Sequence, residues 1–165
     1  MKLAAALGLV VAAVTAGAAA PASRPRACLA TDLAATASFQ GGTGSAEGGV
    51  VVVNRSASRC VVFGRPLVDV LANGQRLATR QVVGRATKGR RVPRFVALTP
   101  QRGAFVHIRC SNWCGVRDAT FHLRLWIQTV RPRVAVRGSV GAPRCDDPAG
   151  SSTVSVGPFE PVLRH

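Results

Sequence analysis

The sequence predicts an all-β domain, an immunoglobulin-like antiparallel two-sheet sandwich of about eight or nine strands. Three observations support this prediction. After residue 30, no ten-residue stretch has the helical periodicity of apolar residues. Short apolar runs instead alternate with turn residues such as Gly, Pro and Asn, which is typical of sandwiches and barrels. Residues 120–127 alternate between apolar and polar side chains, as a strand with one buried face does. A small β-barrel is the alternative architecture.

In chain order, strands are expected at 33–40, 50–53, 60–63, 67–71, 92–98, 104–110, 120–127, 134–136 and 153–156. Residues 50–53 are all valine, which predicts a strand buried on both faces. The glycine-rich segment 41–45 is expected to be a flexible loop. Asn73-Gly74 predicts a hairpin turn, because both residues tolerate positive φ. The turn residues 100–103 are expected to join 92–98 and 104–110 as a strand pair.

The N-terminus has the features of a secretory signal peptide. Lys2 precedes an apolar, alanine-rich run over residues 3–20, and small residues follow at a position suited to cleavage after Ala22. We therefore expect residues 1–22 to be removed and residues 23–165 to form one domain, secreted or on the exterior of the cell envelope. An uncleaved membrane anchor is the alternative, because the run approaches the length of a membrane span.

Five cysteines remain after the signal peptide, and in an oxidising compartment they predict disulfides with one residue left over. Cys28 could join Cys60, and Cys114 could join Cys145, each closing a loop of about 30 residues. The alternative is a zinc site built from Cys110 and Cys114 with a histidine or Cys145, but a second close pair of ligands is missing. No metal or other cofactor is therefore expected.

A set of turns, cysteines and strand ends resembles the secreted, mostly actinobacterial family called domain of unknown function 4232. The resemblance covers nearly the whole mature chain and rests on Cys28, Leu33, Asn54-x-Ser56, Cys60, Gly64-x-Pro66, Leu98-x-Pro100, residues 111–114, residues 143–145 and residues 156–158. It implies an exported β-sandwich in which Cys28 pairs with Cys60 and Cys114 with Cys145, and it implies no activity. The chain departs from the family at Arg65, where an aromatic residue is usual, and at Cys110, an extra cysteine that is expected to be a free thiol.

Catalytic machinery is not recognisable in the sequence. The histidines are His107, His122 and His165, and no Gly-x-Ser-x-Gly nucleophile motif is present. His122 is expected on the polar face of its strand as a solvated neighbour. The adjacent acids Asp146 and Asp147 precede a proline and are typical of a turn. We therefore expect a protein that is not an enzyme, and a small hydrolase is the last of the alternatives.

The distribution of charge is the most informative functional feature. The formal net charge is +15. Between Asp69 and Asp118 no acid interrupts the basic residues that we call the basic belt: Arg76, Arg80, Arg85, Lys88, Arg90, Arg91, Arg94, Arg102, Arg109 and Arg117. The densest part, Arg85, Lys88, Arg90, Arg91 and Arg94, is expected to form a loop that binds polyanions.

Export suggests which polyanions the belt would meet: anionic lipid head groups or wall polymers that carry phosphate or uronate. No nucleic-acid-binding motif is present, so a specific nucleic-acid partner is not expected. A structural or protein-partner domain of the envelope, with contacts from sheet edges or from Trp113 and Trp126, is the alternative. A basic surface that serves solubility alone is the simplest explanation of the charge.

Overall fold

The computed structural model describes residues 25–87, 91–114, 120–127 and 133–162, so the predicted signal peptide lies outside the described residues. One short 3-10 helix, η1 (Ala30–Asp32), precedes the strands. The described strands are β1 (Leu33–Gly42), β2 (Ser45–Asn54), β3 (Cys60–Phe63), β4 (Leu67–Ala72), β5 (Gln75–Arg76), β6 (Arg80–Val83), β7 (Phe95–Leu98), β8 (Gly103–Ser111), β9 (Phe121–Trp126), β10 (Val134–Arg137) and β11 (Thr153–Pro161). Within these residues, no helix is long and apolar enough to cross a membrane.

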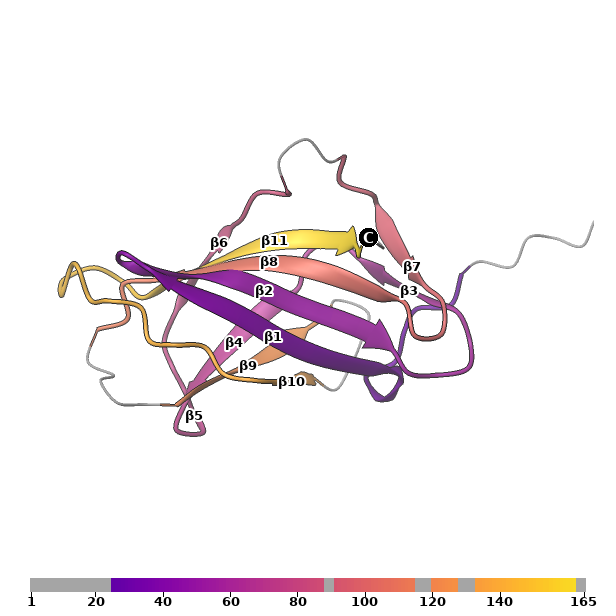
Figure 1. The fold of residues 1–165 in the computed structure, drawn as a ribbon, viewed down its shortest axis with the longest axis horizontal. Helices are drawn as coiled ribbons and strands as arrows, with labels where there is room; N and C mark the ends of the chain where they lie inside the picture. The colour runs from indigo at the N-terminus through magenta and orange to yellow at the C-terminus, as the bar shows by residue number, and fades with distance from the viewer. Residues whose placement is uncertain (1–24, 88–90, 115–119, 128–132, 163–165) are drawn as a thin grey trace, which may run out of the picture.

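The predicted all-β class is confirmed, with one curled sheet as its main element. Nine strands follow the order β5-β4-β9-β10-β1-β2-β8-β11-β6, and β3 and β7 form a second, two-stranded sheet. The curl places β4, β9 and β10 behind β1, β2, β8 and β11 (Figure 1). Two pairings, β1–β10 and β11–β6, are parallel, so the sheet is mixed rather than wholly antiparallel. The architecture therefore combines features of the sandwich and of the barrel.

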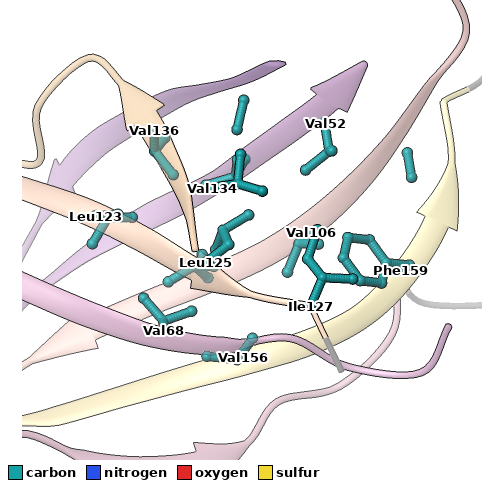
Figure 2. Close-up of a cluster of buried hydrophobic side chains, with 14 of the residues drawn as sticks. Val52, Val68, Val106, Leu123, Leu125, Ile127, Val134, Val136, Val156 and Phe159 are labelled. Atoms are coloured by element: carbon teal, nitrogen blue, oxygen red, sulfur yellow. The ribbon is translucent and has the colours of Figure 1, made fainter. Parts of the chain in front are cut away.

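The core lies between the two halves of the curled sheet. Leu123, Leu125 and Val134 come from one half, and Val106 and Phe159 from the other (Figure 2). In β9 the predicted alternation is confirmed, since Phe121, Leu123 and Leu125 are buried and the side chains between them are less buried. Each strand of this kind gives one face to the core and leaves the other as an outer face of the sheet.

The N-terminal hairpin corrects two expectations. Residues 41–45 are not a flexible loop, because β1 and β2 pair as far as Gly42 and Ser45 and leave only Thr43 and Gly44 in the turn. Gly44 has φ +71°, a conformation that favours glycine. The valine run of β2 is fully buried on one face only, since Val51 and Val53 on the other face are half-buried.

The strand pairing around the small sheet also differs from the expectation. Residues 92–98 were expected to pair with 104–110, but β7 pairs with β3, and β8 pairs with β2 and β11. The chain does turn before β8, with a hydrogen bond from Arg102 N–H to the Thr99 carbonyl (2.9 Å), but this turn leads from the small sheet into the large one. Gln101 N–H donates to the Asn54 carbonyl (2.9 Å). β5 and β6 were not expected.

Two part-buried side-chain hydrogen bonds connect β6 to the start of β4. The Gln81 side chain accepts a hydrogen bond from Val68 N–H (2.8 Å) and donates one to the Pro66 carbonyl (3.0 Å). These bonds satisfy backbone groups at the start of β4, where the ladder with β5 has not yet begun. Gln81 thereby connects β6, the last strand of the sheet order, to β4, the second strand, across the opening of the curl.

Asn54 at the end of β2 joins three segments of the chain. Its side-chain NH2 donates to the carbonyls of Ser58 (2.8 Å) and Leu98 (3.0 Å), and its side-chain oxygen accepts from the N–H and hydroxyl of Ser56. Asn54 is fully buried. The Asn-x-Ser sequence is therefore a structural turn in which the amide nitrogen is already used twice.

The structure contains the two disulfides that the family resemblance implies. Cys28 is bonded to Cys60 at the start of β3, and Cys114 is bonded to Cys145. Cys110 on the inner face of β8 is a free, buried thiol. Burial raises the pKa of the Cys110 thiol to about 12, because the thiolate would lose its hydration in the core.

Candidate anion-binding surface

The basic belt is described in part. Lys88, Arg90 and Arg117 lie outside the described residues. Arg76 pairs with Asp69. The remaining belt members, Arg80, Arg85, Arg91, Arg94, Arg102 and Arg109, are exposed, and none of their guanidinium groups forms an ion pair or hydrogen bond with the part of the chain that is described.

The chain that leaves β6 is held against β11 rather than extended into solvent. Gly84 N–H donates to the Val156 carbonyl (2.8 Å), and the Arg65 guanidinium donates to the Gly84 carbonyl (3.1 Å). A Cβ at Gly84 would lie 2.6 Å from the carbonyl carbon of Val156, so only glycine fits this close approach. Arg65, the departure from the family turn, is thus an anchor for the first residues of the belt loop.

A second anchor holds the same segment three residues later. Thr87 N–H donates to the Glu160 carboxylate (2.7 Å), and Glu160 is only 1% exposed. Gly84 and Thr87 are therefore both fixed to β11, with Arg85 between them. The expectation of a loop that begins at Arg85 is therefore corrected for its first part. Residues 84–87 are hydrogen-bonded to the sheet, so the backbone of Arg85 has a defined position next to β11.

Between segment 83–87 and the outer face of the sheet lies a groove that we call the anion groove. Its volume is about 530 Å³, within the range of roughly 300–1,000 Å³ typical of small-ligand sites. Its lining residues are Glu47 of β2, His107 and Arg109 of β8, Ser155 of β11, and Val83, Arg85, Ala86 and Thr87. Glu47, Arg109 and Ser155 are register partners on three adjacent strands, so they form one row across the sheet.

The charged groups that line the anion groove differ in whether they have a partner. His107 Nε2 and Glu47 Oε1 are 3.0 Å apart, so the single carboxylate of the groove already has a partner in the imidazole. Arg85 and Arg109 have no such partner among the described residues. Among the described residues, two guanidinium groups and one carboxylate line the groove, and the buried Glu160 carboxylate lies next to it, bonded to Thr87. The hydroxyls of Thr87 and Ser155 add donors of the kind that bind carboxylate or phosphate oxygens.

A second groove, which we call the glycine groove, adjoins the first and shares Glu47 with it. It has a volume of about 520 Å³ and crosses the outer face of the β1–β2 hairpin. Its lining residues are Ser38, Gln40, Gly41, Gly42, Ser45, Glu47, Gly48, Gly49 and Phe105. A Cβ at Gly49 would overlap the Phe105 ring, so the absence of a side chain there lets the ring lie flat against β2.

The opposite outer face, on β4, β9 and β10, holds a different arrangement. The Asp69 carboxylate is 3% exposed and accepts from Trp126 Nε1 (2.8 Å). It also pairs with Arg76 Nε (2.9 Å) and with Arg133 (3.3 Å), and the Arg133 guanidinium stacks over the Trp126 ring at 4.0 Å from its centroid. This acid neutralises the arginines around it.

The remaining candidate residues have other environments. Trp113 is 3% exposed and packs on Phe121, so the expectation that it provides a surface contact is wrong. His122 is exposed, as expected, with Nδ1 3.2 Å from the Gly138 carbonyl. Cys114 and Cys145, considered above as zinc ligands, are bonded to each other.

Sequence reasoning found Arg85 and Arg109 but did not connect them with Glu47 and His107. The signal that could have done so is the alternation within the strands. On β8, His107 and Arg109 lie on either side of the buried Ile108, and on β2, Glu47 follows the buried Ala46. Because successive side chains of a strand point to opposite faces, these three polar side chains lie on the outer face. The register that brings β2 beside β8 was not available from the sequence.

The fold and these contacts define an all-β, disulfide-bonded domain with an arginine-lined groove on one outer face. The profile of the family described as Domain of unknown function (DUF4232) matches residues 28–160. The chain therefore belongs to this family, which has no assigned function. No curated protein and no solved structure matches the chain significantly.

Proposed function

We propose that the protein is a non-catalytic, exported domain that binds an anionic surface or polymer of the cell envelope through its basic belt. The observation that supports this function is the exposure of the belt arginines without acidic partners among the described residues, notably Arg85, Arg91, Arg94 and Arg109. Arginine forks match the geometry of carboxylate and phosphate oxygens, and an uncompensated positive field concentrates polyanions near it.

The predicted signal peptide and the two disulfides support the proposed location outside the cytoplasm. The two disulfides are compatible with an extracytoplasmic location, since cytosolic thiols are kept reduced. Outside the cell, anionic lipid head groups and wall polymers with phosphate or uronate groups are the abundant polyanions. Binding to such a partner requires no catalytic group.

The test measures binding of the mature protein to an acidic wall polymer and to vesicles with anionic lipid, at low and physiological salt. Replacing Arg91 and Arg94 with Gln should weaken binding to the polymer and to the vesicles about thirtyfold, because each of the two basic residues near an anionic surface contributes on the order of 1 kcal/mol. Binding should fall steeply with ionic strength. The matched control replaces Arg55 and Arg59, two exposed arginines outside the belt, and should change binding little. If the parent protein binds no polyanion, the proposal is wrong.

A protein-partner domain is the alternative, and one observation favours it. Leu67 and Trp126 are register partners on β4 and β9, and 55% and 37% of their side chains are exposed. A partner that packs on this pair would bind with little dependence on salt. Leu67→Ser should then weaken binding to an isolated envelope fraction, whereas the Arg91 and Arg94 variant should not.

A further inference from the structure

We infer that the anion groove and the adjoining glycine groove together form one binding site for an extended anionic glycan, whose carboxylate or phosphate group lies between Arg85 and Arg109. This inference rests on the proposed function and specifies its site and ligand. The ligand is a polymer of sugars that carry carboxylate or phosphate groups.

The first observation behind this inference is the position of the two arginines. Arg109 comes from β8, between β2 and β11, and Arg85 comes from the segment fixed to β11 by the anchors at Gly84 and Thr87. Both line the anion groove, and neither has a partner among the described residues. Two guanidinium groups that line one groove can donate to the same oxyanion without first breaking an internal ion pair.

The anchors make this arrangement pre-organised. The backbone on both sides of Arg85 is already ordered by hydrogen bonds to Val156 and to the buried carboxylate of Glu160. A ligand therefore does not have to order this segment when it binds, and the free energy of binding is correspondingly more favourable. The belt residues Arg91 and Arg94 lie further along the chain and do not line the groove.

The second observation is the lining of the glycine groove, which indicates that the ligand is a sugar polymer. Its lining combines serine hydroxyls, the Gln40 amide and the Glu47 carboxylate with an aromatic ring, Phe105. Hydroxyl and amide groups match the hydroxyls of a sugar, while an aromatic ring can pack against its apolar C–H face. Glu47 lines both grooves, so a chain that places one unit at the arginines can place the next unit over Gly48 and the Phe105 ring.

The shape of the site favours a polymer over a membrane. The arginines line a groove between the sheet and segment 83–87, and the second groove continues across the β1–β2 hairpin. A single extended chain can enter such a recess along its length. A bilayer presents its head groups in a plane and does not follow a groove of this kind.

The experiment measures affinity by calorimetry for a six-residue uronate oligosaccharide, with the uncharged oligosaccharide of the same length, inorganic phosphate and anionic vesicles as comparison ligands. Replacing Arg85 and Arg109 with Gln should weaken binding of the uronate about 100-fold, roughly tenfold for each lost charge-assisted contact. For this short oligosaccharide, the Arg91 and Arg94 double variant should lose only about threefold, less than for a long polymer, because neither side chain lines the grooves. The Arg55 and Arg59 double variant should be unchanged. Phe105→Leu should weaken the oligosaccharide about fivefold and leave phosphate binding unaffected.

The outcomes separate this inference from the proposed function. If the parent binds the uronate and the Arg91 and Arg94 variant loses as much affinity as the groove variant, the groove is not the site, although the belt function stands. If only vesicles bind, the glycan is the wrong ligand. Equal affinity for the uncharged oligosaccharide would contradict the role of the anion. If no anionic ligand binds, both proposals fall.

A measurement on the unmodified protein guards against a groove variant that fails to fold. Titration of the parent with the uronate, followed by amide chemical shifts, should perturb Glu47, Arg85, His107 and Ser155 in the anion groove and Gly48 and Gly49 in the glycine groove. Shifts confined to residues 91–94 would overturn the inference without any substitution.

Discussion

Both outer faces of the curled sheet carry arginines, but the arginines have different partners. On the face of β4, β9 and β10, the buried Asp69 binds Arg76, Arg133 and the Trp126 indole. On the face of β2, β8 and β11, Arg85 and Arg109 line a groove whose one carboxylate is paired with a histidine. The first face uses its charges to stabilise the fold, while the second leaves them available.

The difference teaches that net charge alone does not locate a binding surface. The chain has 22 basic and only 7 acidic residues, so the position of each acid decides which arginines remain unpaired. A guanidinium beside a buried carboxylate is neutralised and held in place. An exposed, unpaired guanidinium can exchange its water for the oxygens of a ligand, and it is therefore the more informative feature.

The largest effect is expected at Asp69. Asp69→Ala should lower the free energy of unfolding by about 2–4 kcal/mol, because it leaves the Trp126 N–H and two guanidinium groups without their acceptor. The loss is smaller than for a fully buried ion pair, since the side chains of Arg76 and Arg133 are partly exposed and can be hydrated. Denaturant unfolding measures it.

The matched control for this substitution is Glu47→Ala on the other face. Glu47 is 58% exposed, and its pair with His107 should contribute less than about 1 kcal/mol. If the two alanine variants lost the same stability, the distinction between a structural face and an available face would be wrong.

Part of the fold was predictable because the local signals were strong. The alternation of β9 follows directly from its side chains, and the Asn73-Gly74 turn has positive φ at both residues, as that dipeptide favours. β6 was missed because its side chains do not alternate: Arg80 and Val83 are exposed, and Gln81 and Val82 are half-buried. Its place depends on parallel pairing with β11, a contact between residues about 70 positions apart.

The candidate site was predictable in composition but not in geometry. The basic belt is visible in the sequence, and it includes both Arg85 and Arg109. The anchors are not visible, because Arg65 and Glu160 look like ordinary charged residues until the fold brings them to the two ends of segment 84–87. A groove formed by four segments of the chain depends on tertiary contacts that no local pattern encodes.

A smaller effect is expected from Cys110, which lies next to Arg109 on β8 but faces the core. Burial raises the pKa of this thiol from 9.0 to about 12, so the unfolded chain loses its proton first as the pH rises. The contribution of the protonated thiol to the free energy of unfolding is fully present below pH 9. It decreases as the pH rises from 9 to about 12, and the loss is about 1.4 kcal/mol at pH 10. The chain has no tyrosine, so few other groups titrate in this range.

Unfolding measured between pH 8 and pH 10 tests this expectation, with Cys110→Ala as the control. The comparison uses the slope with pH, because the alanine variant also loses packing in the core. The slope should be present in the parent and nearly absent in the variant. Equal slopes would show that the inner face of β8 does not exclude water from the thiol.

The smallest effect on stability, and a gain of binding, is expected from Glu47→Gln. The glutamine keeps an acceptor for the His107 N–H, so the free energy of unfolding should change by less than about 0.5 kcal/mol. Removal of a negative charge about 6 Å from a bound anion should strengthen uronate binding roughly threefold to tenfold at low salt, if the effective dielectric constant lies between about 40 and 80. The gain should shrink at physiological salt and be absent for the uncharged oligosaccharide. An unchanged affinity would place the anion away from Glu47, and the unpaired arginines of this face would then not mark the site of the anion.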